Sequence, residues 1–325
     1  MRNSPCSHRA PEQIVHAVAH AKPSYGSQAA ADGSRGSPKR ERVSLYAGVE
    51  KLDLEQAIGD GIRLPDQLIE PLLASAGYRV IVPYLRGYGT TRFLSSEIVR
   101  NGQPSAVAAD TIALMDALKI EKATIAGYDW GARTANIVAA LWPERCKAMV
   151  SVSGYLIGSQ EAGKMPLPPK AELEWWYQYY FATERGRAGY QKYTHDFAKL
   201  IWQLASPKWA FDDATFARSA AAFDNPDHVA VVVHNYRWRL DLAEGEPKYD
   251  DLERRLAQFP VIGVPTITLE GDANGAPHPE PSAYAKKFSG KYAHRTIQGG
   301  IGHNLPQEAP KAFAEAVVEV DSYAT

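Results

Sequence analysis

Cysteine is almost missing from this chain of 325 residues, which contains only Cys6 and Cys146. Two distant cysteines without metal-ligand spacing argue against a disulfide framework and fit a reducing compartment. No apolar run approaches the roughly 20 residues of a membrane span, and the amino terminus lacks the hydrophobic core of a secretory signal. These absences predict a cytoplasmic protein with no membrane partner.

An excess of charge of either sign is also missing. The chain carries 36 Lys and Arg against 37 Asp and Glu, a formal net charge of -1. Such a balance argues against a nucleic-acid groove. A hydrophobic content of 45% is enough for a sizeable core. We therefore expect a small molecule as the partner. We predict no cofactor or metal, and the oligomeric state is not predicted.

The first 42 residues differ in composition from the rest. They are rich in Ser, Gly, Ala and Pro, and basic residues outnumber acidic ones. Little apolar surface is available to offset chain entropy, which predicts a disordered tail. An organelle transit peptide is the alternative, because such segments are also basic and poor in acids.

From residue 65 onward, helical and strand patterns alternate. Helices are predicted at 65–77, 106–120 and 132–144, with Leu68, Leu72 and Leu73 on one face of the first. Strands are predicted at 78–85, 122–129 and 147–154. The alternation resumes with strands at 264–272 and 292–298 and a closing helix at 306–320. This order predicts an α/β fold with a mostly parallel sheet flanked by helices.

An aromatic-rich, helix-like region interrupts this alternation. We assign 43–158 to the first part of the sheet domain, 159–246 to an inserted helical cap and 247–325 to the second part of the sheet domain. The first part is incomplete at its N-terminal strands.

The stretch "GYDWG" has small residues two positions before and after Asp129. Gly127 and Gly131 allow the tight strand-to-helix turn that lifts a side chain above a sheet. Backbone N–H groups at the following helix start stabilise an anion there. Further along, Asp272 ends a strand pattern, and His303 lies in the glycine-containing loop "GGIGHN".

Asp129 at the turn, the second acid Asp272 and then His303 follow one another in the chain order that is typical of the α/β-hydrolase fold. Within that superfamily the chain resembles the branch of epoxide hydrolases and haloalkane dehalogenases, whose turn reads G-x-D-W-G. The resemblance extends from about Pro65 to the carboxyl terminus and includes "RGYGTT", Arg86 to Thr91.

The resemblance implies a hydrolase that acts through an ester of Asp129. A carboxylate is ionised at neutral pH and can attack a saturated carbon directly. His303, oriented by Asp272, then activates water, and the backbone N–H of Trp130 contributes to the oxyanion hole. In the family, two cap tyrosines assist epoxide opening, and here Tyr177 in "YQYYF" and Tyr236 in "HNYRW" match. The alternative for both tyrosines is that they only pack against their neighbours and take no part in catalysis.

One family feature is missing from the sequence. The H-G-x-P loop, which supplies the second oxyanion N–H, has no counterpart, because no His-Gly pair occurs. Only "RVSLYAGV", 42–49, is available as a replacement for the strand before that loop. An epoxide hydrolase is the main prediction. The alternatives are a dehalogenase that uses Trp130 and a second halide donor, or a defective, non-catalytic protein.

Overall fold

The computed structural model describes the backbone of Tyr46–Ala47 and residues 69–323. The predicted tail at 1–42, the missing H-G-x-P loop and the boundary at residue 43 lie outside these residues.

The main sheet has four parallel strands in the order β3-β4-β5-β6. Their bounds are Ala123–Gly127, Cys146–Val152, Thr266–Gly271 and Tyr292–Ile297. All residues of β3 and β5 are buried, as expected for strands covered on both faces. A smaller parallel pair joins β1 (Tyr46–Ala47) to β2 (Arg92–Phe93). With the four parallel strands and their flanking helices, the predicted α/β class is confirmed.

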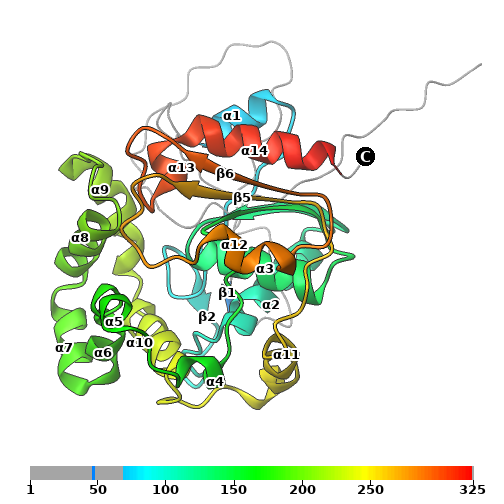
Figure 1. Cartoon of the computed structure of the whole chain (residues 1–325). Helices are drawn as coiled ribbons and strands as arrows, with labels where there is room; N and C mark the ends of the chain where they lie inside the picture. Colours follow the sequence, from blue (N-terminus) through cyan, green and yellow to red (C-terminus); the bar gives the residue numbers. More distant parts are fainter. Residues whose placement is uncertain (1–45, 48–68, 324–325) are drawn as a thin grey trace, which may run out of the picture.

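Helices cover both faces of the main sheet (Figure 1). In the first half of the chain they are α1 (Ile69–Ser75), α2 (Pro104–Ala117) and α3 (Trp130–Leu141). After residue 246 they are α11 (Asp250–Leu256), α12 (Pro281–Tyr284), α13 (Leu305–Glu308) and α14 (Pro310–Ser322), with short 3₁₀ helices η2 (Pro247–Tyr249) and η3 (Ala285–Lys287). α1 and α14 lie on one face, whereas α2 and α3 lie on the other.

The core therefore has two apolar layers. On the α14 side, Leu73 and Phe313 pack against Val150 of β4. On the α3 side, Ile137 packs in the same cluster as Ile125 of β3. Sheet residues that alternate between the two layers hold helices from both halves of the chain together.

Between β4 and η2 all regular elements are helices. They are α4 (Gln160–Gly163), α5 (Pro169–Glu174), α6 (Tyr177–Ala182), α7 (Glu184–Lys192), α8 (Thr194–Ala205), α9 (Asp213–Ala220), the 3₁₀ helix η1 (Ala221–Asp224) and α10 (His228–Arg239). We call residues 160–239 the helical segment; α5 to α10 gather beside one end of the sheet (Figure 1). The predicted domain boundaries at 158/159 and 246/247 stay predictions.

Two expectations near the start of the described chain are wrong. The predicted strand at 78–85 is not hydrogen-bonded into a sheet, although Ile81 and Leu85 are buried. An extended segment becomes a strand only beside a pairing partner, and the outer edge of β3 has no partner strand among the described residues. In α1, Leu73 is buried but Leu72 is 38% exposed, so the apolar face is narrower than predicted.

Within the part of the chain that the structure describes, no helix is long and apolar enough to cross a membrane.

The turn after β3 depends on the absence of a side chain at Gly127. A Cβ atom there would lie 2.4 Å from the carbonyl carbon of Gly131. We predict that Gly127→Ala lowers the free energy of unfolding by about 1–3 kcal/mol, the usual cost of overpacking. Urea denaturation of Gly127→Ala and of Gly158→Ala measures this effect, because a Cβ at Gly158 meets nothing within 4 Å. Equal stability of the two variants would contradict the prediction.

Candidate active site

The backbone at Asp129 adopts a conformation that residues other than glycine rarely use. Its φ is 50° and its ψ is -124°. Such strain of about 1–3 kcal/mol persists only where the surroundings fix it. Here the N–H groups of Gly131 and Ala132 both donate to the carbonyl of Tyr128, at 2.9 and 3.2 Å. The turn therefore presents the carboxylate of Asp129 at the start of α3, beyond the carboxyl end of β3.

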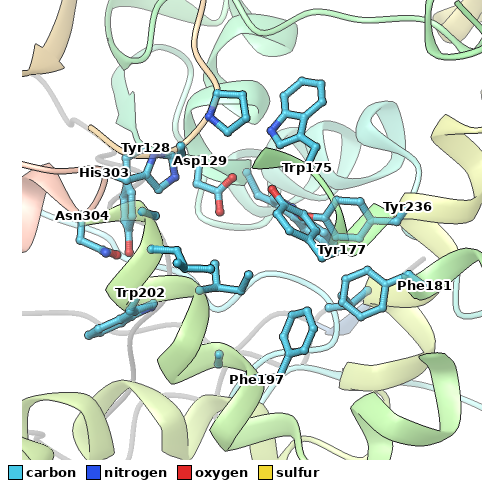
Figure 2. Close-up of a pocket in the computed structure, with 18 of the residues that line it drawn as sticks. Tyr128, Asp129, Trp175, Tyr177, Phe181, Phe197, Trp202, Tyr236, His303 and Asn304 are labelled. Carbon is cyan, nitrogen blue, oxygen red and sulfur yellow. The ribbon is translucent and has the colours of Figure 1, made fainter. Parts of the chain in front are cut away.

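A pocket of about 220 Å³ opens beside this carboxylate. Five of the six residues predicted for the site line it: Asp129, Trp130, Tyr177, Tyr236 and His303. Figure 2 shows Asp129 between the ring of His303 and that of Tyr177. The pocket thus lies between the carboxyl ends of the strands and the helical segment, and side chains from both meet there.

Tyr177 and Tyr236 lie side by side on α6 and α10. Their ring centroids are 5.4 Å apart, with planes at 88°. Burial raises the pKa of Tyr177 well above its ordinary 10.0, and the neighbouring Tyr236 and the charge of Asp129 raise it further, against the charge of Arg239. Burial also raises the pKa of Tyr236, with Asp129 adding to the effect, although nearby Arg239 and Arg133 oppose it. Both phenols are therefore neutral hydrogen-bond donors at pH 7.

The loop that carries His303 is tied to the end of α8. The N–H of His303 donates to the carbonyl of Ala205 at 3.1 Å. Ser206 Oγ accepts from the backbone N–H of Asn304 at 3.1 Å and donates to Glu308 Oε1 at 2.7 Å. A Cβ at Gly302 would lie 2.4 Å from the Cα of Ser206, so the glycine permits this contact. The helical segment thereby fixes the histidine backbone.

The structure does not form the expected hydrogen bond between Asp272 and His303. Asp272 accepts instead from the N–H groups of Gly299, Gly300 and Ile301, at 3.1, 2.8 and 2.8 Å. Desolvation alone would raise the pKa of Asp272, but these three bonds and the charge of Lys208 lower it below its ordinary value. His303 Nδ1 is buried and has no hydrogen-bond partner among the described residues.

Asn274 follows Asp272 by two residues and bonds to groups at the ends of two strands. Its Nδ2 donates to Glu270 Oε1 at 2.7 Å and lies 3.4 Å from Ser153 Oγ. The next residue, Gly275, lines the pocket with Ala276 and Pro277. Sequence reasoning missed Asn274, because an amide in "GDANG" is read as an ordinary turn residue.

Two arginines that line the pocket were also missed. Arg133 lies one turn after Asp129 on α3, and Arg239 is the last residue of α10. In a sequence, an arginine in a helix gives no sign that it faces a cavity. Among the described residues, no group of three His, Cys, Asp or Glu side chains is arranged to hold a metal.

Comparisons with known proteins agree with this fold. Residues 56–199 match the family of the alpha/beta hydrolase fold. A crystal structure of a candidate epoxide hydrolase from Klebsiella pneumoniae is 61% identical, has a TM-score of 0.78, and covers 88% of this chain and 92% of that one. The chain belongs to the α/β-hydrolase fold family.

Curated relatives match over shorter stretches. The epoxide hydrolase of Caballeronia sordidicola is 42% identical over 81 residues, which are 25% of this chain and 24% of that protein. Epoxide hydrolase B of Mycobacterium tuberculosis is 34% identical over 129 residues, 36% of this chain and 35% of that protein. The chain thus spans well under two thirds of the length of these two relatives.

The three N–H contacts of Asp272 predict what its removal does. Asp272→Ala should leave the backbone of Gly299 to Ile301 without an acceptor and loosen the loop before His303. Hydrogen exchange of a peptide spanning 299–304, followed by mass spectrometry, should become faster. Asp213→Ala is the matched control, because Asp213 is exposed and pairs only with Lys199. Unchanged exchange in Asp272→Ala would show that the loop is held without it.

Proposed function

We propose that the chain hydrolyses epoxides through an alkyl ester on Asp129. The observation that carries the proposal is the convergence of Asp129, His303 and the two phenols on one pocket. The similarity to epoxide hydrolases adds support. The partners in this proposal are a small hydrophobic epoxide and water, and the cytoplasm stays the proposed location.

In the first step, a carboxylate oxygen of Asp129 attacks an epoxide carbon. The C–O bond of the ring breaks, and its electron pair goes to the departing oxygen. Tyr177 and Tyr236 donate hydrogen bonds to that oxygen, and one proton is transferred to it. Because burial raises the pKa of both phenols, the donors stay protonated at neutral pH.

In the second step, water attacks the carbonyl carbon of the ester. His303 takes the proton from water and returns it to the departing oxygen as the C–O bond to the substrate breaks, which gives a diol. The acid proton left on Asp129 returns to the phenol that lost its proton in the first step, and the carboxylate of Asp129 is restored. The tetrahedral intermediate places negative charge next to the start of α3. There the N–H of Trp130, the first residue of the helix, needs no partner within the helix.

Asp272 acts in this scheme as a positioning residue. It holds Gly299 to Ile301, the backbone immediately before Gly302 and His303. This role replaces the direct contact that the sequence predicts. Glu308 supports the other end of the loop by accepting from the N–H of Gly302 at 2.7 Å.

The covalent step predicts a trapped intermediate. Incubation of His303→Gln with styrene oxide should give a protein heavier by one substrate, and Asp129→Asn should show no increase. The wild-type protein should accumulate the ester as well, since the missing second oxyanion donor costs about 100- to 1,000-fold in ester hydrolysis. Intact-protein mass spectrometry measures the adduct. His195→Gln is the control, because His195 is exposed and pairs with Asp224 outside the pocket.

Each outcome of this experiment separates two interpretations. Absence of any adduct in folded wild-type and His303→Gln protein would contradict hydrolysis through Asp129 and favour a non-catalytic protein. Full turnover without accumulation in the wild type would show that another N–H replaces the missing donor.

The two phenols predict a difference between leaving groups. Phenylalanine at Tyr177 and Tyr236 should lower the rate of ester formation from styrene oxide by at least about 100-fold, because general-acid assistance contributes about 100- to 10,000-fold. Reaction with 1-bromohexane should be nearly unchanged, because bromide needs no proton. Single-turnover mass spectrometry compares the two substrates. Equal loss for both would favour a packing role, and a preference for the bromide in the wild type would favour a dehalogenase.

The pH dependence provides a second readout of the same residues. A raised pKa means that a phenol loses its proton only above its ordinary value of 10.0. Ester formation from styrene oxide should therefore stay constant between pH 7 and about pH 10. A decrease centred below that value would contradict neutral phenols as the donors.

A further inference from the structure

Arg133 lines the pocket and forms no ion pair with any residue that the structure describes. Its Nε is buried and makes no hydrogen bond among the described residues. Burial and the charge of Arg239 lower the pKa of Arg133, against the opposing effect of Asp129, to about 10. A buried guanidinium needs an anion or several acceptors, since desolvation of the charge is otherwise uncompensated.

Arg86 shows how this chain normally accommodates a buried arginine. Its Nε and Nη2 donate to the two carboxylate oxygens of Asp110, both at 2.7 Å. Its Nη1 also donates to the carbonyl of Asn101 at 2.9 Å. Arg133 has no comparable set of acceptors in the described part of the chain, although its Nε is also buried.

Arg239 faces the same pocket from the helical segment. Its guanidinium carbon lies 5.4 Å from the ring centroids of both Trp175 and Tyr236. No carboxylate among the described residues forms an ion pair with it. Asp129 and Glu174 also line the pocket, but neither is within ion-pair distance of Arg133 or Arg239. Two guanidinium groups thus remain available to one anionic ligand.

We propose that Arg133 and Arg239 bind a carboxylate of the substrate, so that the pocket takes short 2,3-epoxy acids. The proposal rests on the function proposed above and names its substrate class. A planar guanidinium matches a carboxylate with two parallel hydrogen bonds. The N–H of Arg133 donates to the carbonyl of Asp129 at 3.0 Å, which puts the two side chains one helical turn apart. Both side chains line the same pocket, so a short epoxy acid with its carboxylate at Arg133 presents a ring carbon to Asp129.

The reaction balances as an ordinary epoxide hydrolysis. Asp129 attacks one ring carbon of the epoxy acid, and water releases a 2,3-dihydroxy acid whose carboxylate is unchanged. The aromatic side chains around the pocket, such as Phe181 and Tyr190, favour an apolar group on the other ring carbon. A 3-phenylglycidate has both features.

Binding of unreactive ligands tests the anion site without any turnover. Calorimetry at fixed ionic strength should show that 3-phenylpropanoate binds at least about tenfold more tightly than 3-phenylpropanamide, as charged hydrogen bonds imply. Arg133→Gln and Arg239→Gln should lose this preference and keep their affinity for the amide. Arg237→Gln is the matched control, because it lies on the same helix as Arg239 and pairs with Glu184 outside the pocket. Equal wild-type affinities, or equal loss for both ligands, would overturn the proposal.

Thermal unfolding gives an independent check on the unpaired cation. Arg133→Gln should unfold at the same temperature as the wild type or at a higher one, because a buried unpaired charge is removed. Arg86→Gln should unfold at a lower temperature, because it leaves the Asp110 carboxylate without its partner. A lower unfolding temperature for Arg133→Gln, by as much as for Arg86→Gln, would show a structural role and contradict the proposal.

Turnover separates this proposal from the proposed function. Wild-type protein should convert 3-phenylglycidate with at least about tenfold higher kcat/KM than 3-phenylglycidamide, and Arg133→Gln should remove the difference through KM. Equal conversion of both compounds would overturn the anion site but retain the epoxide hydrolase. Arginine-dependent binding of 3-phenylpropanoate without any diol or adduct would retain the anion site and contradict the hydrolase.

Discussion

The close backbone contact between Gly127 and Gly131 is the constraint on which the site depends. Because neither residue has a side chain, the last residue of β3 can lie against the first turn of α3. The chain between them must then reverse within one residue, which forces Asp129 into a positive φ. The same geometry brings the first N–H groups of α3 and the Asp129 carboxylate to one place. The proposed nucleophile and the proposed oxyanion donor are thus produced by one turn, and the remaining groups have to be brought to it.

The remaining groups come from parts of the chain that the turn does not control. The loop of His303 is fixed by Ala205 and Ser206 at the end of α8, and by Glu308. Tyr177 and Tyr236 lie on α6 and α10, which contact one another through aromatic rings. The ring centroids of Phe181 and Tyr236, for example, are 5.0 Å apart. The geometry of the pocket therefore depends on how the helical segment packs against the sheet. A substitution that shifts α8 would move His303 and part of the pocket lining together.

Local patterns predicted much of this arrangement, and long-range contacts account for the errors. Gly127 and Gly131, two positions before and after Asp129, predict the turn. The family resemblance pointed to His303, Tyr177 and Tyr236, which all line the pocket. Asp272 was linked to the wrong partner, because its acceptors are satisfied by backbone N–H groups 27 to 29 residues later. The segment 78–85 has the composition of a strand, but pairing depends on a neighbour. The interior position of Arg133 cannot be read from a helical pattern.

Burial acts in opposite directions on the two kinds of polar group in this pocket. It raises the pKa of Tyr177 and Tyr236, because ionisation would create a poorly solvated anion. It lowers the pKa of Arg133, because there the protonated form is the charged one. The phenols are thereby kept as neutral donors for the leaving oxygen of the proposed reaction, whereas the guanidinium carries a charge that an anion would offset. The same buried pocket therefore favours a substrate with two features. Its reacting end beside Asp129 is uncharged, and a negative charge lies a few bonds away from that end.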